Sequence, residues 1–431
     1  MNSCKRLLSS VTAVIMATSV LAGCSSKAAS TTKVQKEIEI KFPSFWVGKD
    51  SKAKTMNDLI TKFNTDNAGK IKVTVEEIAD YNAYEDKMKT NVAADTVPDV
   101  FIIKTGTLAQ NYFKSGRLMD FTSYLKDGWK DKFVTNAIES NSYQSKVMAI
   151  PYEYGVTPVL FNDALLKQAG VMEFPKNYTE FFAACDKLKA ANIIPMSQMT
   201  GENAWTSMLW YSQLVVAIGG PDVYKNIEKD GLKDPAFVEA AKVLQKMYKY
   251  TTNDAIGAGA AVAAGHFLNA RTAMLMNGPW FIGRIKKEGV NDMYSQVKVA
   301  PAPLYEGGKG KEGGYIGFVQ SDLCAAVQKD KDKETAVVKF LKYLTEAENI
   351  KKLSAESGSM FVIKTDAPSN IEKLQGQMIE QTNKAPYLVP HFQLMVKPAC
   401  GTEFPQVLAS LGSAKITPEQ FVQRLNDKQM Q

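Results

Sequence analysis

The amino-terminal third of the chain alternates between strand-like and helix-like patterns, and this alternation constrains the fold more than any other feature. Apolar and polar residues alternate in 38–42 and 71–75, and a short apolar run fills 99–103. Between these segments, apolar residues recur at helical spacing in 56–63 and 84–92. A β-α-β-α-β order within about 65 residues is typical of a parallel, doubly wound sheet. We therefore expect an α/β protein.

The length and the composition predict more than one globular domain. A chain of 431 residues is too long for one ordinary hydrophobic core. Hydrophobic residues make up 45% and charged residues 23%, which is typical of folded proteins. Strand-like segments continue to residue 319, and the chain from residue 371 onward is mostly helical in pattern, interrupted by several prolines.

The charged and metal-ligating residues exclude several classes of function. The formal net charge is +7, but Arg, the preferred reader of phosphates and bases, occurs at only five positions. Only two His are present, His266 and His391, and no HExxH, CxxC, Walker A or GxSxG motif occurs. We interpret both His as packing or surface residues. We expect no nucleic-acid partner, no metal, no cofactor and no catalytic residue.

The first 23 residues have the features of an export signal. Lys5 and Arg6 precede an apolar stretch that is too short for a typical membrane-spanning helix. The run that ends at Cys24, Leu-Ala-Gly-Cys, resembles a bacterial lipobox. This resemblance implies that 1–23 is a lipoprotein signal peptide and that Cys24 carries lipid at the extracytoplasmic face of the cell membrane. The polar segment 24–36 is then a flexible tether. The alternative is an ordinary signal peptide with a chance Cys.

The three Cys that remain in the mature chain are too scattered for a disulfide scaffold. Cys185 lies on the apolar face of an expected helix and Cys324 in an expected strand. We interpret both as buried packing groups. The sequence leaves open whether either of them pairs with Cys400.

Aromatic side chains follow several of the expected strands. Ligands of open α/β sheets lie beyond the carboxyl ends of the strands, and there the chain places Phe45-Trp46, Lys104-Thr105, Tyr152-Glu153 and Gly278-Pro279-Trp280. An indole face suits the apolar C–H patch of a sugar, and neighbouring polar groups suit its hydroxyls. The alternative is that Trp46 and Trp280 fill the ends of domains.

Two further residues, Tyr81 and Trp205, belong to this set with weaker support. Tyr81 opens an expected helix, and Trp205 and Trp210 are five residues apart on another, where we expect Trp205 to be the exposed member of the pair.

Glu153 has two functional interpretations. It accepts hydrogen bonds from ligand hydroxyls, or it is the general acid of a glycoside hydrolase, which requires a second carboxylate nearby.

Several longer stretches, taken together, resemble one known family. They are TVPDVFII (96–103), AIPYEYGVTPVLFN (149–162), GHFLNARTAMLMNGPWFIGRI (265–285), VAPAPLYEGGKGKEGG (299–314) and FLKYLTEAENIKKLSAESGSMFVI (340–363). In this order, across the mature chain, they are similar to family 1 extracellular solute-binding proteins, the sugar-capturing lipoproteins of bacterial ABC importers. Position 160–162 is Leu-Phe-Asn where many relatives have a Tyr-Asn pair.

The resemblance implies an architecture and a site. The fold is the two-lobed type II periplasmic-binding-protein fold, each lobe a doubly wound sheet flanked by helices and discontinuous in sequence. Lobe 1 comprises 37–153 and 302–346, and lobe 2 comprises 154–301 and 347–431. Trp280 is implied to stack on a sugar. The predicted ligand-binding residues are Phe45, Trp46, Tyr81, Thr105, Tyr152, Glu153, Trp205, Gly278, Trp280 and Gly314.

The sequence therefore predicts a lipid-anchored, monomeric binding protein that captures a sugar, an oligosaccharide, by closure of its lobes. Its implied partners are this carbohydrate, the permease subunits of an ABC transporter, and the membrane through the lipid alone. Two alternatives remain open at this point, namely a surface-anchored glycoside hydrolase and a receptor for a non-sugar solute such as a peptide. The sequence does not specify which sugar is bound.

Overall fold

The structure is a computed structural model of the chain, and it describes residues 36–105, 107–133, 137–138, 141–365 and 372–431. The chain divides into two units, Met1–Lys36 and Glu37–Gln431. The predicted signal peptide, Cys24 and all but the last residue of the predicted tether lie outside the described residues. Everything below concerns the second unit.

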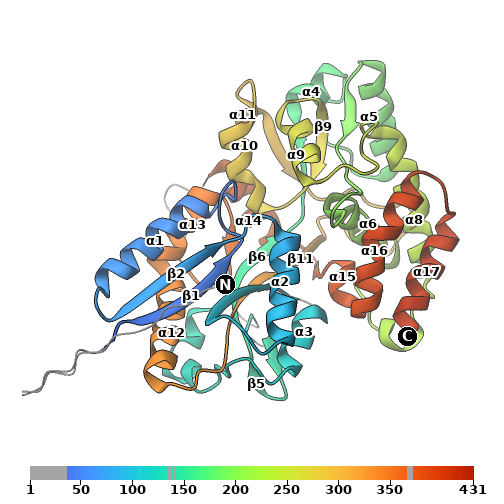
Figure 1. Ribbon diagram of the computed structural model, residues 1–431. Coiled ribbons are helices and arrows are strands. Elements are labelled where there is room, and N and C mark those ends of the chain that lie inside the picture. Colours follow the sequence, from blue (N-terminus) through green and yellow to red (C-terminus); the bar gives the residue numbers. More distant parts are fainter. Residues whose placement is uncertain (1–35, 106, 134–136, 139–140, 366–371) are drawn as a thin grey trace, which may run out of the picture. The chain divides into compact units, whose positions relative to one another are not determined.

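The predicted β-α-β-α-β order is confirmed by β1 (Ile38–Ser44), α1 (Ala53–Asp66), β2 (Ile71–Glu77), α2 (Tyr81–Ala93) and β3 (Val100–Lys104). Strands β1 and β2 pair in parallel over their whole length (Figure 1). In α1, the helical spacing of Met56, Leu59, Ile60 and Phe63 places all four on the buried face. The sequence pattern thus specifies these elements through the side chains that they bury.

The largest sheet is mixed rather than purely parallel. Its strand order is β12-β6-β11-β13, and β3 pairs with β11 as well; the new strands are β6 (Ile150–Val156), β11 (Tyr315–Ala325), β12 (Met360–Phe361) and β13 (Leu388–Val389). Strand β11 is antiparallel to both β3 and β6. The expected parallel arrangement therefore holds for β1 and β2. In the larger sheet, β11 comes from a distant part of the chain and runs antiparallel to β3 and β6.

A second sheet is formed by the middle of the chain. It has the order β10-β7-β9-β8, with β7 (Val159–Asn162), β8 (Ile194–Met196), β9 (Thr272–Met276) and β10 (Val297–Ala300). Strands β8 and β9 are parallel, and the other two pairings are antiparallel. A separate two-stranded ribbon pairs β4 (Ser142–Tyr143) with β5 (Lys146–Val147).

The remaining described elements are helices that follow or cover these sheets. They are α3 (Thr107–Lys114), η1 (Tyr124–Asp127), η2 (Lys130–Lys132), α4 (Asp163–Gln168), α5 (Tyr178–Ala190), α6 (Trp205–Gly219), α7 (Ile227–Asp230), α8 (Pro235–Met247), η4 (Tyr248–Tyr250), α9 (Ala260–Leu268), η5 (Pro279–Phe281), α10 (Ile282–Glu288), α11 (Met293–Gln296), α12 (Lys331–Leu344), α13 (Ala347–Ser357), α14 (Lys373–Lys384), α15 (Phe392–Met395), α16 (Pro398–Gly412) and α17 (Pro418–Met430). In Figure 1, α12 and α13, drawn in orange, lie beside the blue α1 and β1, with which they are in contact.

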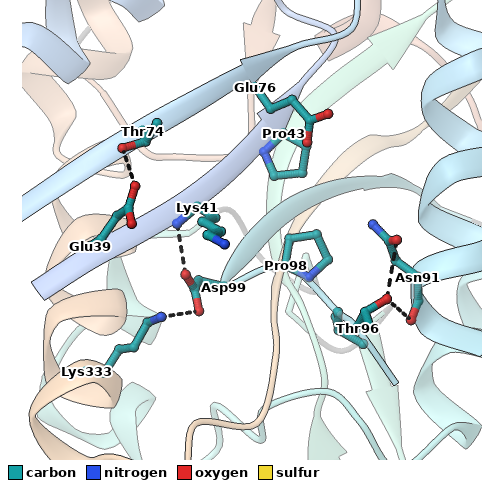
Figure 2. A pocket seen from close by; sticks show the side chains of 11 residues that line it. Glu39, Lys41, Pro43, Thr74, Glu76, Asn91, Thr96, Pro98, Asp99 and Lys333 are labelled. Atoms are coloured by element: carbon teal, nitrogen blue, oxygen red, sulfur yellow. Dashed lines mark hydrogen bonds and ion pairs between the residues drawn. The ribbon is translucent and has the colours of Figure 1, made fainter. Parts of the chain in front are cut away.

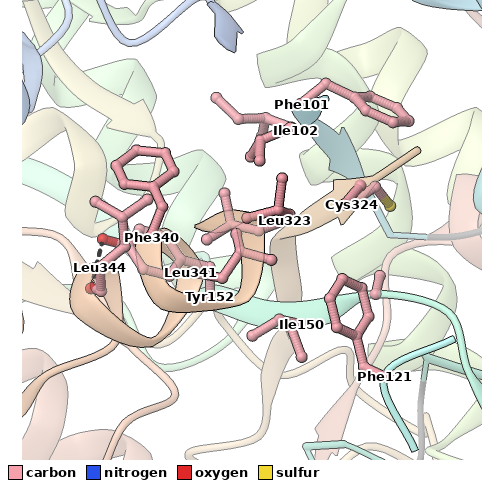
Figure 3. Packing of buried hydrophobic residues seen from close by; sticks show 14 of the residues in the cluster. Phe101, Ile102, Phe121, Ile150, Tyr152, Leu323, Cys324, Phe340, Leu341 and Leu344 are labelled. Carbon is pink, nitrogen blue, oxygen red and sulfur yellow. Dashed lines mark hydrogen bonds between the residues drawn. The ribbon is translucent and has the colours of Figure 1, made fainter. Parts of the chain in front are cut away.

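Two large hydrophobic cores support the two sheets. Figure 3 shows part of the first, in which Phe101 of β3, Leu323 of β11 and Phe340 of α12 pack together. The second core gathers side chains from β7, β9, α5, α6, α8, α16 and α17, with Trp210 and Phe404 completely buried in it. The described chain therefore contains two large hydrophobic cores.

Strands β6 and β11 contribute side chains to more than one core. In β11, Ile316 packs in the second core and Leu323 in the first. In β6, Ile150 packs in the first core and Val156 in a smaller cluster around α9 and α10. The family resemblance implies crossings near 153, 302 and 346, and β6 contains the first of these positions. Leu353 of α13 packs in the first core, so a boundary drawn from the cores would fall after the predicted position 346.

The predicted burial of Cys185 and Cys324 is confirmed, and Cys400 is buried too. All three thiols are free. Within the part of the chain that the structure describes, no helix combines the length and the apolar character that are needed to cross a bilayer.

Candidate ligand-binding site

A cavity of about 650 Å³ lies beside the strand ends from which the aromatic residues were predicted to project. Rings from several separate segments line it, and amides and charged groups lie among them. The lining rings are Phe45, Trp46, Tyr81, Trp205, Trp280 and Phe281, and the polar groups include Asp50, Lys52, Lys104, Glu153, Glu202, Asn203, Asn277 and Gln320. Flat apolar faces next to hydroxyl-binding groups are the features that a carbohydrate requires.

The position of Trp280 follows from the turn after β9. The strand ends at Met276, and Gly278 leads into the short helix η5, in which Trp280 is half-buried. The indole lies across Gly278, where a Cβ atom would come within 2.2 Å of the ring. Gly278 is therefore required for the close approach of the ring, and it does not itself line the cavity.

Trp46 and Phe45 form the opposite part of the lining, on the loop after β1. Trp46 is only 1% exposed and stacks on Tyr152, with ring centroids 5.4 Å apart. Phe45 makes edge contacts with Trp46 and with Tyr81 of α2. These contacts hold the rings in place before any ligand arrives.

Tyr152 and Gly314, like Gly278, do not line the larger cavity. Tyr152 is 0% exposed, and its hydroxyl donates to the backbone oxygen of Leu344. Successive side chains of a strand point to opposite faces, so Glu153 of β6 lines the cavity while Tyr152 packs behind Trp46 in the core. Gly314 lies against the ring of Tyr387, away from the cavity lining.

The expected division of roles between the two tryptophans of α6 is confirmed. Trp210 is completely buried in the second core, whereas Trp205 is half-buried at the start of the helix and lines the cavity. The Trp205 ring centroid lies 5.9 Å from that of Trp280. Two indoles thus lie side by side on one part of the lining.

Glu153 is held in a buried ion pair that the sequence pattern did not predict. Its carboxylate is 1% exposed and lies 3.2 Å from the Nζ atom of Lys52, which also contacts Asp50 at 3.3 Å. Burial alone would lower the pKa of Lys52, but the two carboxylates outweigh it and raise this pKa. The Glu153 carboxylate thus accepts a hydrogen bond from the Lys52 ammonium.

A second cavity of about 420 Å³ shares part of its lining with the first. Thr105 lines it and donates a hydrogen bond to the buried Asp322. His391 also lines it, with its ring packed edge-on against Trp205 and Phe318. Residues common to both cavities are Tyr81, Asn82, Lys104, Glu202, Asn203, Trp205 and Gln320. The two cavities therefore adjoin along one continuous set of side chains.

Buried polar atoms without a partner occur at this lining. The Nε1 atom of Trp46, the Oδ1 atom of Asn203 and the Oε1 atom of Gln320 form no hydrogen bond with the described residues. Leaving such an atom unpaired costs about 1–3 kcal/mol. A bound ligand would supply hydrogen-bond partners for these three atoms, either directly or because the lining rearranges when it binds.

A third pocket, of about 550 Å³, lies beside strands β1 and β2, and its lining is mainly polar and charged rather than aromatic (Figure 2). The carboxylate of Asp99 accepts from the backbone N–H of Lys41 and pairs with Lys333. No aromatic ring is among its lining residues, so it does not offer the stacking surface of the larger cavity.

Among the described residues, no group of three His, Cys, Asp or Glu is placed to hold a metal ion. His266 instead pairs with Asp254 at the surface.

In open α/β folds, small-molecule ligands bind in a cavity of this kind, beside the strand ends. Residues 58–372, well over half of the chain, match the model of the bacterial extracellular solute-binding protein family. The chain belongs to this family, as its motifs indicated.

Individual relatives are distant. The chain is similar to a maltotriose-binding protein of Pyrococcus abyssi (27% identity, 65% of this chain and 58% of that protein) and to a multiple sugar-binding protein of Streptococcus mutans (24%, 80% of each). Putative binding proteins of Brucella abortus match at 23% identity, and the chain spans 63% of their length.

Solved structures confirm the type II periplasmic-binding-protein fold. A protein from the study of xylan utilization by Caldanaerobius polysaccharolyticus superposes with a TM-score of 0.84, at 22% identity, over 91% of this chain and 100% of that one. A chitin oligosaccharide binding protein gives 0.83, at 22% identity, over 91% and 98%.

Proposed function

We propose that this protein is an extracytoplasmic receptor that binds an oligosaccharide and delivers it to the permease of an ABC transporter. The observation that carries the proposal is the lining of the cavity, where indoles of Trp46, Trp205 and Trp280 surround amides and carboxylates. The names of the Pyrococcus and Streptococcus relatives, which bind maltotriose and multiple sugars, agree with this ligand class.

The dimensions of the site favour more than one sugar ring. Cavities of roughly 300–1,000 Å³ hold ligands of a few hundred daltons. The larger cavity measures about 650 Å³, and the adjoining one adds about 420 Å³. Because both share Trp205 and Tyr81, a ligand can extend from one into the other without leaving an aromatic surface.

Closure around the ligand is the proposed basis of transport. Phe45 packs against the first core and Trp205 against the second, so one ligand bound between these rings contacts residues that belong to both. A ligand that makes more contacts in a closed state shifts the population towards it, and the permease would recognise that state. The segments β6 and β11, which contribute to more than one core, are the proposed crossings.

The same proposal includes a lipid anchor at Cys24 and action as a monomer. The support for the anchor is the Leu-Ala-Gly-Cys run after the charged, apolar leader. A Cys24→Ala variant should appear in the soluble or secreted fraction and lose acyl labelling. Continued acyl labelling and membrane retention of the variant would contradict the anchor.

We propose that the protein binds its sugar without cleaving it. Hydrolysis requires a carboxylic acid that can give up a proton, whereas Glu153 is held as the partner of the Lys52 ammonium. Release of monosaccharide by the wild-type chain, abolished in Glu153→Gln, would contradict this part of the proposal.

A thermal-shift screen tests the proposed ligand class. The purified chain is mixed with neutral and acidic di- to tetrasaccharides, and with peptides of similar mass. A ligand at a hundred times its Kd stabilises the native state by about 2.7 kcal/mol, so the unfolding temperature should rise with a saccharide and not with the peptides. Stabilisation by peptides alone would overturn the proposal.

A further inference from the structure

The ammonium of Lys104 lies where the two cavities meet, and it forms no ion pair with the described residues. Lys104 ends strand β3, and its Nζ atom lies 3.7 Å from the ring centroid of Tyr81 and 5.2 Å from that of Trp205. No hydrogen bond or ion pair joins this atom to another side chain of the described residues. Two aromatic rings therefore hold a cation whose N–H donors are unused.

The carboxylates that line the two cavities are already engaged. Each accepts from an ammonium or from a backbone N–H group close to it. The pairs are Asp50 and Glu153 with Lys52, Glu85 and Asp86 with Lys89, Asp80 with the N–H of Ala83 at the start of α2, and Glu202 with the N–H of Ala260 at the start of α9. None of these described carboxylates forms an ion pair with Lys104, although Glu85, Glu153 and Asp50 lie near enough to favour its charged form.

The charge on Lys104 persists at neutral pH in spite of its surroundings. Burial lowers the pKa of this ammonium to about 8, which still leaves most of it protonated at pH 7. His391, the titratable neighbour from the other side, is neutral because burial and then the charge of Lys104 lower its pKa to about 3. The junction of the cavities thus presents a half-buried ammonium to the ligand.

We propose that the ligand carries a carboxylate, as an oligosaccharide containing a uronic acid does, and that Lys104 binds this group. The inference rests on the proposed function, because it names the class of sugar that the same site takes. An ion pair in a desolvated site is stronger than the hydrogen bond of a neutral hydroxyl. Asn203 and Gln320 line the same junction, and the amide oxygens that lack a partner there accept hydrogen bonds from the hydroxyl groups of the same sugar.

Matched pairs of trisaccharides test this inference by calorimetric titration of the full chain at pH 7. The pairs are β-1,4-linked glucose and glucuronate, β-1,4-linked mannose and mannuronate, and α-1,4-linked galactose and galacturonate. We expect at least one acidic trisaccharide to bind ten times or more tighter than its neutral partner. In Lys104→Met this preference should fall to within about threefold, and Lys104→Arg should keep most of it.

Lys126 offers a control lysine, because it is exposed and lies outside the lining of both cavities. Lys126→Met should leave the preference within about twofold of wild type, and thermal unfolding verifies that each variant is folded. If neutral trisaccharides bind as tightly as acidic ones, or if Lys104→Met retains the preference, the inference is wrong while the proposed function stands. If neither this set nor the wider saccharide screen binds, the proposed function fails, and the inference fails with it.

Discussion

Asp322 shows how one buried side chain can make the whole fold sensitive to pH. It is completely buried on β11, and its carboxylate accepts from Asn141 at 2.6 Å and from Thr105 at 2.8 Å. No cation forms an ion pair with it among the described residues. Burial raises the pKa of this carboxyl from its ordinary 3.8 to about 7, although the two hydrogen bonds act in the opposite direction.

Replacing this carboxyl should flatten part of the pH dependence of stability. The folded state holds the proton of Asp322 up to about pH 7 and the unfolded chain releases it near pH 4, so the folded state binds more protons between these values. The free energy of unfolding therefore falls as pH rises through this window, by at most about 1.4 kcal/mol per pH unit. Relative to wild type, Asp322→Asn should become progressively more stable from pH 4 to pH 8 in urea unfolding.

Asp222→Asn, at an exposed position, is the control for this experiment and should differ from wild type by the same small amount at every pH. A pH-independent difference between Asp322→Asn and wild type would show that the carboxyl titrates normally in the folded state.

The aromatic residues of the site were easier to predict than its charged ones. Rings after strand ends are unusual in the sequence itself, and the structure places Trp46, Trp205 and Trp280 in the cavity. Lys52 and Lys104 carried no such signal, because a lysine becomes distinctive only when distant segments bury it or deprive it of a partner. The alternation of β6 could have separated Glu153 from Tyr152, had the strand's register been known.

At the scale of elements, the buried pair of Lys52 and Glu153 ties the start of α1 to strand β6. The ammonium is 2% exposed and the carboxylate 1%. Removing one partner of such a pair leaves a buried charge without compensation, which costs about 3–5 kcal/mol. Lys52→Met should lower the free energy of unfolding by this amount in urea titrations, and adding Glu153→Gln should restore part of it.

The control for this pair is Lys54→Met, which removes one partner of the solvent-exposed pair of Lys54 and Asp58 in the same helix. Exposed pairs contribute little, because water screens both charges, so no marked loss is expected. An equal loss in Lys52→Met and Lys54→Met would contradict the role assigned to the buried pair.

Helices and strands with a clear hydrophobic pattern were predicted from the sequence, whereas the strands with which they pair were not. The spacing of Met56, Leu59 and Phe63 is sufficient to identify α1. Nothing local to β3 shows that it pairs with β11, because that strand is supplied by residues 315–325, far along the chain. The type of each element is thus a local property, whereas sheet order depends on long-range pairing.

At the scale of the whole molecule, the proposed closure predicts a change in dimensions. The first core and the second core are joined by β6 and β11, so movement between them would change the separation of the segments that line the cavity. Solution scattering of the chain, with Cys24→Ala to avoid the lipid, should give a smaller radius of gyration with a saturating saccharide. Identical profiles with and without the saccharide would count against closure.

The most direct test of the central claim is the affinity of a Trp280→Ala variant for the saccharide that stabilises wild type most. The half-buried indole lines the cavity, so its removal should weaken binding about thirtyfold, or roughly 2 kcal/mol, as for a binding hot spot. The free energy of unfolding should fall by less than the roughly 3–5 kcal/mol of an emptied core site. Tyr250→Ala, outside both cavities, is the control and should retain wild-type affinity. Unchanged affinity of Trp280→Ala, together with severe destabilisation, would show that Trp280 fills the core and that the sugar site lies elsewhere.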